Sequence, residues 1–492
     1  MSVSLVGSPQ TLTPGYNESV WYFDSSNKNL PGFRYYIQIL NSSSVVIGTY
    51  RYAPSITVGY AIVNLSRILK NFLSADDNTG TTIQSVPNSW FGYTIKVYEE
   101  YNTAFTYGNF VNPYFPVGDL TALYSAGTVH PFAVGDQINI SQTDGGVLNA
   151  SLQGIHTVIA PTVVGSHYVY IDVSNASLAA GTMGGSVIYA DNRKTVSTVQ
   201  YTSSSHYVFN GAVPFEDFIT WNDVDYKMIG ASTATKFLTS MPTWGNDGPF
   251  HIYETQDIRL NFANYFTTGN KIHFKNDSGD EFLITTGVNT TSQAIMSVQV
   301  GPLTTMSSCT IGSAPLVKPT TNYYTFWVEN SGGTQISETR SFWIDRRCRI
   351  QQDEIVFMDR MGSLVSYAFP LRGDVVNNNT KSTYKKLAGG LSSDVVGTAY
   401  NYASTAKGEQ IYNVNYSSSM TMNTNWMTDD ESLYFQELIS SPITYLKTDN
   451  NTGTYINCIV TTSSMAEQRS IDKRLIQYTI NVRYSNPTNI NF

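Results

Sequence analysis

The sequence predicts a mainly β protein, made of several antiparallel β-sandwich or barrel domains with a few short capping helices. Three observations support this fold class. Aromatic residues make up 13% of the 492 residues, and charged residues also make up only 13%, about half the usual share. Apolar and polar residues alternate in many segments, which is the period of a half-buried strand. Turn sequences rich in Asn, Asp and Gly separate these segments.

The alternation predicts individual strands and hairpins. It is clearest at Phe33, Tyr35, Ile37 and Ile39, at Tyr93, Ile95 and Val97, and at Ile476, Tyr478, Ile480, Val482 and Tyr484. Hairpin turns are expected at 276–280, at 330–335 and at 448–453, because Asn, Asp and Gly supply the backbone conformations that tight turns need.

Helices are expected to be few and short. The spacing of Leu65, Ile68, Leu69, Phe72 and Leu73 predicts an amphipathic helix within 62–74. A second helix is expected over 428–440, because Thr428 followed by Glu431 is a capping-box pattern. A third, weaker candidate covers 215–221.

The order of these elements predicts the domain organisation. The expected parts are an N-terminal β domain (1–125), an inserted small β-barrel (126–198), an aromatic connector that completes the first domain (199–245), a second antiparallel β domain (246–345) and a C-terminal β domain (346–492).

Charge and composition exclude several classes of protein. The net charge of −8 argues against direct nucleic-acid binding, which depends on Lys and Arg. No run of apolar residues approaches the roughly 18–20 needed to span a membrane, so no membrane insertion is expected. The first residues lack the basic and apolar regions of a secretory signal. Cys309, Cys348 and Cys458 stand far apart, which predicts buried thiols and synthesis in a reducing cytosol.

The lack of recognisable catalytic motifs predicts that the chain is not an enzyme and carries no cofactor or metal. It has no metalloprotease, nucleophile-elbow or phosphate-loop motif. His251 with Glu254 is the one candidate metal pair, but it lacks a third ligand. The histidines are scattered, at His130, His156, His167, His206, His251 and His273.

Two adjacent carboxylate pairs could suggest glycoside hydrolysis. They are Asp353 with Glu354 and Asp76 with Asp77. Glycosidase carboxylates usually come from different strands, so adjacency is no evidence for catalysis. Asp76 and Asp77 are expected in a solvated turn.

Two further motifs have a structural alternative. The segment 276–281 resembles half of a calcium loop, but a hairpin turn explains it better because the closing Glu is absent. The triplet 372–374 reads Arg-Gly-Asp, and we expect it to be a chance occurrence in a turn after Pro370.

A cluster of positive charge has two open interpretations. Arg346, Arg347 and Arg349 either pair across a subunit interface with carboxylates or protect a solvated strand edge from mispairing. The candidate carboxylates are Asp353, Glu354 and Asp359.

Several sequence segments resemble those of the tail-tip or baseplate-type structural proteins of tailed bacteriophages that infect Bacteroidetes. They lie at 32–40, 45–54, 61–74, 210–223, 236–242, 346–370, 423–446 and 469–487 and cover about half of the chain. The resemblance implies a virion protein, made in the bacterial cytoplasm, that acts as a tail, hub, ring or baseplate component. Its partners would be copies of itself in a ring or other symmetric oligomer, and other tail proteins. The inserted module would project outward as decoration or a weak host-glycan contact.

Two alternatives belong to other functional classes. A carbohydrate-binding adhesin or receptor-binding protein would need an exposed aromatic platform, for which Trp90, Trp221 and Trp244 are candidates. No glycan-binding residues are assigned beyond these three candidates. A glycan-degrading enzyme is the third hypothesis.

Overall fold

The computed structural model divides the chain into two compact units. Unit 1 comprises residues 1–11, 18–66 and 92–207, and unit 2 comprises 12–17, 67–91 and 208–492. The residues described are 2–30, 32–55, 57–76, 83–102, short stretches between 115 and 189, 194–242, 250–265, 269–285, 294–302, 310–311, 314–346, 353–387, 390–391, 400–401, 408–447, 455–462 and 477–485. Strands dominate both units, which confirms the predicted mainly β fold class.

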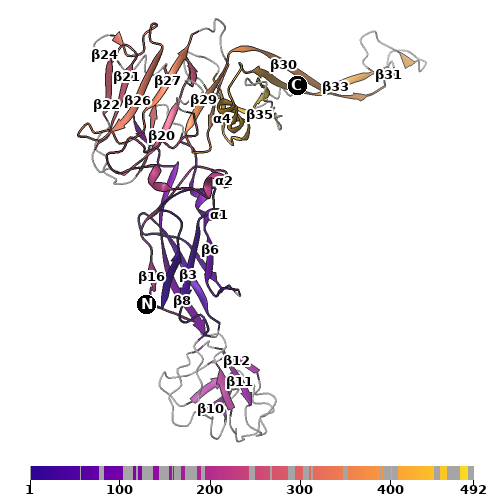
Figure 1. Cartoon of the computed structure of the whole chain (residues 1–492). Helices are drawn as coiled ribbons and strands as arrows, with labels where there is room; N and C mark the ends of the chain where they lie inside the picture. Colours follow the sequence, from indigo (N-terminus) through magenta and orange to yellow (C-terminus); the bar gives the residue numbers. More distant parts are fainter. Residues whose placement is uncertain are drawn as a thin grey trace. The chain divides into compact units, whose positions relative to one another are not determined.

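Unit 1 is a β-sandwich (Figure 1). One layer contains β1 (Val3–Gly7), β3 (Val20–Ser25) and β6 (Ala61–Asn64). The other contains β17 (His206–Phe209), β8 (Trp90–Asn102), β4 (Arg34–Asn41) and β5 (Val46–Tyr52), and β15 (Lys194–Val196) and β16 (Tyr201–Thr202) also pair with β8.

The inner faces of these layers meet through aromatic side chains. Trp21 on β3 contacts Tyr93 on β8 edge to face, with ring centroids 6.4 Å apart. Tyr35, Ile37 and Ile39 are fully buried, as their alternation predicts. The two layers therefore share one core.

The helix expected over 62–74 is shorter than predicted. Residues up to Asn64 form β6, and only α1 (Ser66–Leu69) and a 3₁₀ turn η1 (Lys70–Phe72) follow. The reason is that β6 pairs with β3, and the Asn64 side chain then accepts a hydrogen bond from the Ser66 amide.

The inserted module contributes two three-stranded sheets. One has the order β13-β10-β9 and the other β12-β11-β14, and no closed barrel is formed by the strands that are described. Their bounds are β9 (Phe115–Val117), β10 (Leu120–Tyr124), β11 (Gln137–Gln142), β12 (Gly154–Thr157), β13 (Tyr168–Ile171) and β14 (Ser186–Tyr189).

The insertion begins and ends earlier than the expected 126–198. Strands β9 and β10 pair within the sheet that contains β13, so they belong to the module. Strand β15 pairs with β8 and so belongs to the sandwich. The inserted strands thus lie between Asn102 and Lys194.

Unit 2 contains three main sheets. A four-stranded sheet has the order β18-β20-β23-β7, a five-stranded sheet β19-β27-β26-β21-β22, and a seven-stranded sheet β29-β28-β34-β35-β36-β33-β30. The strands are β7 (Gln84–Ser85), β18 (Lys227–Met228), β19 (His251–Tyr253), β20 (Arg259–Asn264), β21 (Lys271–Asn276), β22 (Glu281–Thr285), β23 (Ala294–Gln299), β26 (Tyr323–Glu329), β27 (Arg340–Asp345), β28 (Asp353–Met358), β29 (Leu364–Phe369), β30 (Leu371–Lys385), β33 (Glu409–Asn423), β34 (Thr444–Lys447), β35 (Tyr455–Val460) and β36 (Thr479–Tyr484). Two short strand pairs complete the unit, namely β24 (Thr310–Ile311) with β25 (Ala314–Pro315), and β31 (Gly390–Leu391) with β32 (Tyr400–Asn401). Strand β2 (Leu12–Pro14) pairs with β17 at the edge of the sheet that contains β8.

One continuous core runs through unit 2. It includes residues from Met228 to Val482, so the expected division at 345/346 does not separate two cores. Phe250, from the predicted second domain, packs edge to face on Tyr434 from the predicted third, with centroids 5.6 Å apart. The segment after 208, expected to complete the first domain, also lies in unit 2.

Helix α4 (Asp429–Ser440) covers one face of the seven-stranded sheet. Phe435 stacks on Tyr478 at 5.5 Å and meets Tyr367 edge to face at 4.9 Å. The predicted capping box is present, with Thr428 and Glu431 bonded in both directions. The weaker helix candidate at 215–221 is a single turn, α2 (Phe215–Phe218).

Candidate functional site

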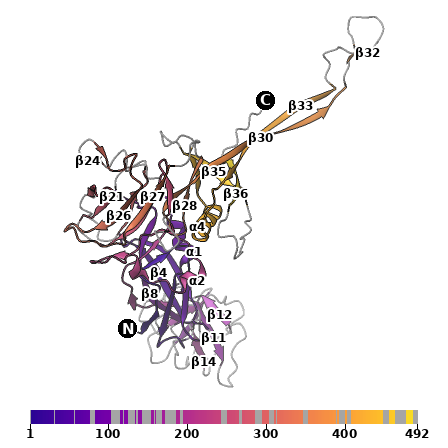
Figure 2. The ribbon, with the colours of Figure 1, turned by 45° about the horizontal axis from the view of Figure 1, so that its top comes forward.

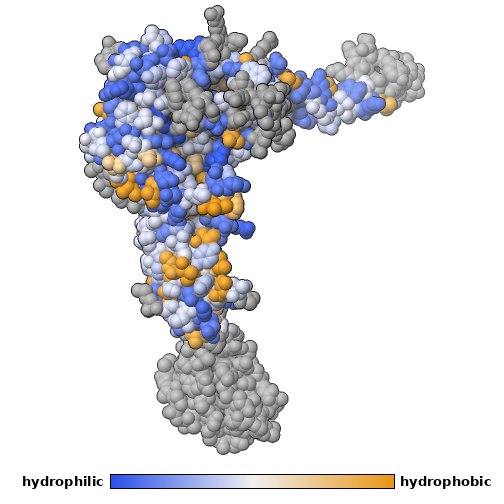
Figure 3. Space-filling view, in the orientation of Figure 1, coloured by the Kyte–Doolittle hydropathy of each residue, from blue (hydrophilic) through white to orange (hydrophobic). Residues whose placement is uncertain are grey.

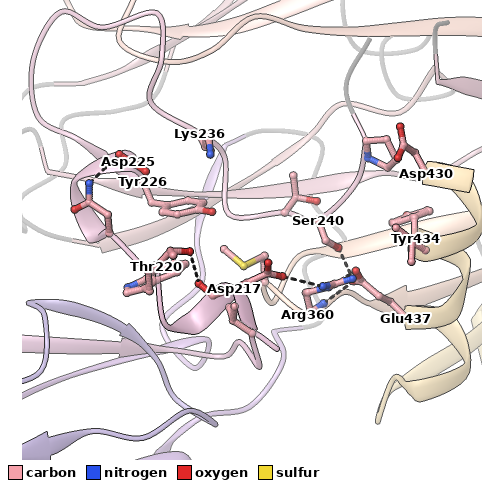
Figure 4. Close-up of a pocket in the computed structure, with 17 residues that line it drawn as sticks. Asp217, Thr220, Asp225, Tyr226, Lys236, Ser240, Arg360, Asp430, Tyr434 and Glu437 are labelled. Carbon is pink, nitrogen blue, oxygen red and sulfur yellow. Dashed lines mark hydrogen bonds and ion pairs between the residues drawn. The ribbon is translucent and has the colours of Figure 1, made fainter. Parts of the chain in front are cut away.

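A cavity of about 650 Å³ opens in unit 2 between α2, α4 and the turn after β28 (Figure 4). Its volume lies within the range of natural ligand and side-chain pockets. The lining residues are Val213, Asp217, Thr220, Trp221, Asn222, Asp225, Tyr226, Lys236, Thr239, Ser240, Pro242, Arg360, Met361, Asp430, Leu433, Tyr434 and Glu437. We call this cavity the acidic pocket, because four of these residues are carboxylates and two are cations.

The first wall comes from α2 and a 3₁₀ turn, η4 (Asp223–Asp225). Trp221 anchors this wall, because its ring is buried and its Nε1 donates to the Leu12 carbonyl at 3.0 Å. The Tyr226 ring stacks on Trp221 with centroids 4.6 Å apart. Lys236 lies over Tyr226 at 5.9 Å from the ring centroid. The wall is therefore held in place before any partner arrives.

The second wall is one face of α4. Asp430, Leu433, Tyr434 and Glu437 follow each other at helical spacing, so they project to the same side of the helix. The capping box at Thr428 fixes where this helix begins and thereby places Asp430 at the rim.

The floor is the turn between β28 and β29. Glu437 receives the Arg360 Nε–H, the Arg360 amide at 3.0 Å and the Ser240 hydroxyl at 2.5 Å. Arg360 also lies 3.5 Å from Asp217, so one guanidinium links both walls, as the dashed lines in Figure 4 show. Glu437 is thus a structural anchor whose charge is already compensated.

A second carboxylate lies buried beneath the floor. Asp359 accepts hydrogen bonds from Thr239 Oγ1 at 2.6 Å, from the Ser240 amide at 3.0 Å and from the Ser363 amide at 2.8 Å. Burial, together with the nearby charge of Glu437, raises the pKa of Asp359 to about 7.

The carboxylates that remain available to a binding partner lie at the rim of the pocket. Asp430 is exposed, and Asp225 is exposed with one hydrogen bond from Asn222 Nδ2 at 3.1 Å. None of the described lining residues is a histidine or a cysteine, and the lining offers charged and hydrogen-bonding groups. Among the described residues, no group of three or more potential metal ligands gathers anywhere.

A second exposed feature of unit 2 is a long two-stranded ribbon formed by β30 and β33 (Figures 1 and 2). Each strand has 15 residues, and β36 pairs with β33 only at Ser419–Asn423. We call residues 377–418 the arm. Within the described residues, both outer edges of its ribbon portion, 377–385 with 409–418, lack a neighbouring strand.

None of the described side chains of the arm is buried. Residues 374–381 and 383–387 are all exposed. The exposed side chains include large apolar groups, and Leu387 is 79% exposed. The other large apolar or aromatic side chains exposed on the described part of the arm are Tyr384, Ile411 and Tyr412.

The aromatic platform expected for a carbohydrate-binding protein is not found at Trp221. That side chain is only 8% exposed and lies behind Tyr226 in the pocket wall. Trp90 is partly buried and packs against the core of unit 2. Trp244 lies outside the described residues.

Within the chain, Arg346 of the arginine cluster pairs with none of the three candidate carboxylates. Its guanidinium pairs with Glu254 and donates to the carbonyls of Lys318 and Thr321, so it ties loops together inside unit 2. Glu354 pairs with Lys447 instead. Arg347 and Arg349 lie outside the described residues.

The other candidate chemical groups have local structural partners. Glu254 of the His251 pair is engaged by Arg346. Asp76 accepts hydrogen bonds from the amides of Asn88 at 2.9 Å and Ser89 at 3.1 Å. These bonds hold the segment that follows η1 against the start of β8. Asp77 lies outside the described residues, as do Cys309 and Cys348, whereas Cys458 is buried.

The calcium-loop-like segment and the Arg-Gly-Asp triplet are both ordinary parts of strands and turns. Asn276 accepts from the amides of Ser278 and Asp280 in a hairpin turn, and Gly279 has φ +86°. The triplet 372–374 lies on β30 rather than in the expected turn. Gly373 sits at an irregularity of the strand pairing, where a Cβ would lie 2.5 Å from the Thr421 carbonyl oxygen.

Sequence reasoning missed both the acidic pocket and the arm. The pocket residues come from three distant segments, and none of them forms a motif. The arm carries no alternation, because neither of its faces is buried. The one available signal was the long polar run 377–383, which has no apolar residue and therefore no core face.

Comparison with known proteins does not place this chain in a family. Neither the family models nor the curated proteins include a match to it. As for membranes, none of the described helices combines the length and the apolar character that a crossing requires.

Proposed function

We propose that this chain is a virion structural protein of a tailed bacteriophage, a tail, hub, ring or baseplate component that assembles into symmetric oligomers and docks neighbouring tail proteins. The observation that carries the proposal is the arm. An isolated two-stranded ribbon is only marginally stable in water. No described strand pairs with the outer edges of the arm, and natural proteins usually cover such edges. A ribbon of this length is expected to be covered by a partner.

The sequence resemblance supports the same proposal from a different direction. The segments that resemble phage tail proteins supply the central strand β4 of unit 1 and the hairpin β28–β29 with helix α4 in unit 2. They therefore lie in the elements that build the two cores, while the arm is the part that a partner would contact.

The composition is also suited to a protein that is covered on many sides. Tyr and Trp give large contact area at a low entropic cost, and low charge limits repulsion between packed copies. Exposed apolar residues flank the acidic pocket on α2 and after it, at Phe215, Ile219, Val224 and Ile229. In Figure 3, hydrophobic residues gather on unit 2 where Figure 1 labels α2.

Shortening the arm tests this proposal. Asn377 is paired with Ser418, so residues 378–417 can be replaced by an Asn-Gly turn that suits a two-residue hairpin. The full chain is expected to form rings or higher oligomers by light scattering and electron microscopy, and the shortened chain to form smaller species. Near-ultraviolet circular dichroism would check that the shortened chain keeps its packed aromatic core.

One result of these measurements would contradict the proposed assembly. A full-length protein that stays a monodisperse monomer at high concentration, with or without the arm, would contradict an assembly function.

A further inference from the structure

The arm carries positive charge on a chain that is otherwise acidic. Residues 377–418 contain four Lys and two acidic residues, which gives the arm a charge of +2. Because the whole chain has a charge of −8, the rest of it carries −10. The lysines are Lys381, Lys385, Lys386 and Lys407, and the acidic residues are Asp394 and Glu409.

The side chains of the described arm lysines make no ion pair within the arm. Lys381, Lys385 and Lys386 are exposed, and none of them makes an ion pair with another described residue. Lys381 and Lys385 are four residues apart on one strand, so both project from the same face, about 13 Å apart. The residues opposite them are Val414 and Glu409.

Apolar side chains lie between and beside these lysines. Ile411 is opposite Thr383, on the same face as Lys381 and Lys385, and is half exposed. Tyr412 is the extra residue at an irregularity in the pairing, and its ring lies 6.2 Å from that of Tyr384. The arm therefore offers cations together with apolar and aromatic groups.

The acidic pocket offers the complementary chemistry. Asp225 and Asp430 are exposed carboxylates at its rim, and no ion pair joins either of them to another described residue. Leu433 in the lining is half exposed, and Trp426, just before α4, is 60% exposed. A lysine that enters such a pocket meets carboxylates, while the neighbouring apolar groups exclude water.

We infer that the acidic pocket of one copy receives the lysine-bearing face of the arm of a second copy. This inference rests on the proposed function and names the partner. Two complementary but different surfaces of the same chain make a head-to-tail contact, which closes into a ring when the rotation allows.

Charge complementarity favours a second copy over a different partner. The arm attracts any acidic protein, but it is joined to a chain whose remainder carries the opposite charge. The described parts of the arm, 377–387 and 408–418, also have the size of one side of a standard interface, which uses about 20–30 residues and buries about 800 Å² per partner.

Charge reversal on the two surfaces tests this inference. The arm variant is Lys381→Glu with Lys385→Glu, and the pocket variant is Asp225→Lys with Asp430→Lys. All four side chains are exposed, so both variants are expected to fold. Lys70→Glu with Lys271→Glu changes the net charge as the arm variant does, outside both surfaces, and serves as the control.

Each variant alone is expected to self-associate about tenfold more weakly than the wild type, which corresponds to about 1.4 kcal/mol. Mixing the two variants should restore association, because Glu on the arm then faces Lys at the pocket. Sedimentation velocity at two salt concentrations gives the readout, and association of the wild type should weaken at higher salt. The control should behave like the wild type.

The outcomes separate this inference from the proposed function. If the shortened arm abolishes assembly while both charge variants assemble normally, the docking site is wrong and the assembly function stands. If the charge variants are weakened but their mixture is not restored, the pairing of these two surfaces is also overturned. If the wild type itself never assembles, the proposed function fails first.

Discussion

Lys447 and Glu354 form an ion pair inside the core of unit 2, with Nζ 3.1 Å from Oε2 and both side chains at most 1% exposed. Lys447 also donates to the Thr255 carbonyl, and Glu354 accepts the Asp257 amide at 2.8 Å. The pair joins β28 to β34 at a register position where the two residues face each other.

Replacing one partner of this pair should be strongly destabilising. Lys447→Met leaves a carboxylate buried without its cation, which typically costs about 3–5 kcal/mol. The free energy of unfolding from urea titrations is expected to fall by this amount. Lys271→Met, on a partly exposed strand residue, is the control and should change it by less than about 0.5 kcal/mol. Equal stability of the two variants would mean that the pair is not buried in solution.

Stability should also depend on pH through the carboxylates with raised pKa values. Burial raises the pKa of Glu354 to about 7, against the opposing charge of Lys447. Burial, with the charge of Glu437, likewise raises the pKa of Asp359 to about 7. Both groups have unfolded pKa values near 4, so between about pH 4 and pH 7 the folded state binds more protons. Stability therefore falls as the pH rises through this window and levels off above it.

Asp359→Asn isolates one of these two groups. The amide oxygen can still accept from the amides of Met361 and Ser363, whereas the proton linkage is lost. Unfolding free energies measured at pH 5, 6, 7 and 8 should decline less steeply in the variant, by up to about 1.4 kcal/mol per pH unit. Parallel curves for the two proteins would show that Asp359 does not titrate in this range.

The capping box of α4 should make a measurable contribution to unit 2. Thr428→Ala removes the side chain that accepts from the Glu431 amide at 3.3 Å, and such a change typically costs about 1 kcal/mol. Thr428→Ser keeps the hydroxyl and is the matched control. Thermal unfolding should show a lower Tm for the alanine variant only. Because Asp430 lies two residues after Thr428, in the first turn of the helix, the alanine variant should also weaken self-association more than the serine variant does.

Those features of the fold that depend on local sequence could be predicted. Thr428 and Glu431 interact across three residues, so their spacing alone indicates the capping box. The turn at 276–280 depends on Asn276 and Gly279, which are close in sequence. Tyr35, Ile37 and Ile39 are buried because alternation follows directly from strand geometry.

Features that depend on distant residues could not be predicted. Arg346 pairs with Glu254 rather than with a carboxylate near it in sequence, because the fold decides which loops meet. The acidic pocket needs Asp225, Arg360 and Asp430, which lie more than 60 residues apart in the chain. The arm escaped prediction for the opposite reason, since strands without a buried face show no hydrophobic period.

The turn that carries Arg360 into the pocket depends on Gly362. Its φ is +83°, and its amide donates to the Asp359 carbonyl at 3.0 Å. A Cβ at this position would lie 2.2 Å from the Asn210 carbonyl oxygen. Since the obstacle is backbone, an added methyl group cannot be accommodated by a side-chain rotation.

Gly362→Ala should therefore destabilise unit 2 more than a positive φ alone explains. Left-handed strain costs about 1–2 kcal/mol, and overpacking adds about 1–3 kcal/mol. Gly279→Ala is the matched control, because Gly279 has φ +86° but nothing within 4 Å of the added Cβ. Urea titrations should thus show a loss of about 1–2 kcal/mol for Gly279→Ala and a larger loss for Gly362→Ala. Gly362→Ala should also weaken self-association, since Arg360 then loses its position between Asp217 and Glu437. Equal losses in the two variants would mean that the turn can move away from Asn210, and the pocket floor would not be rigid.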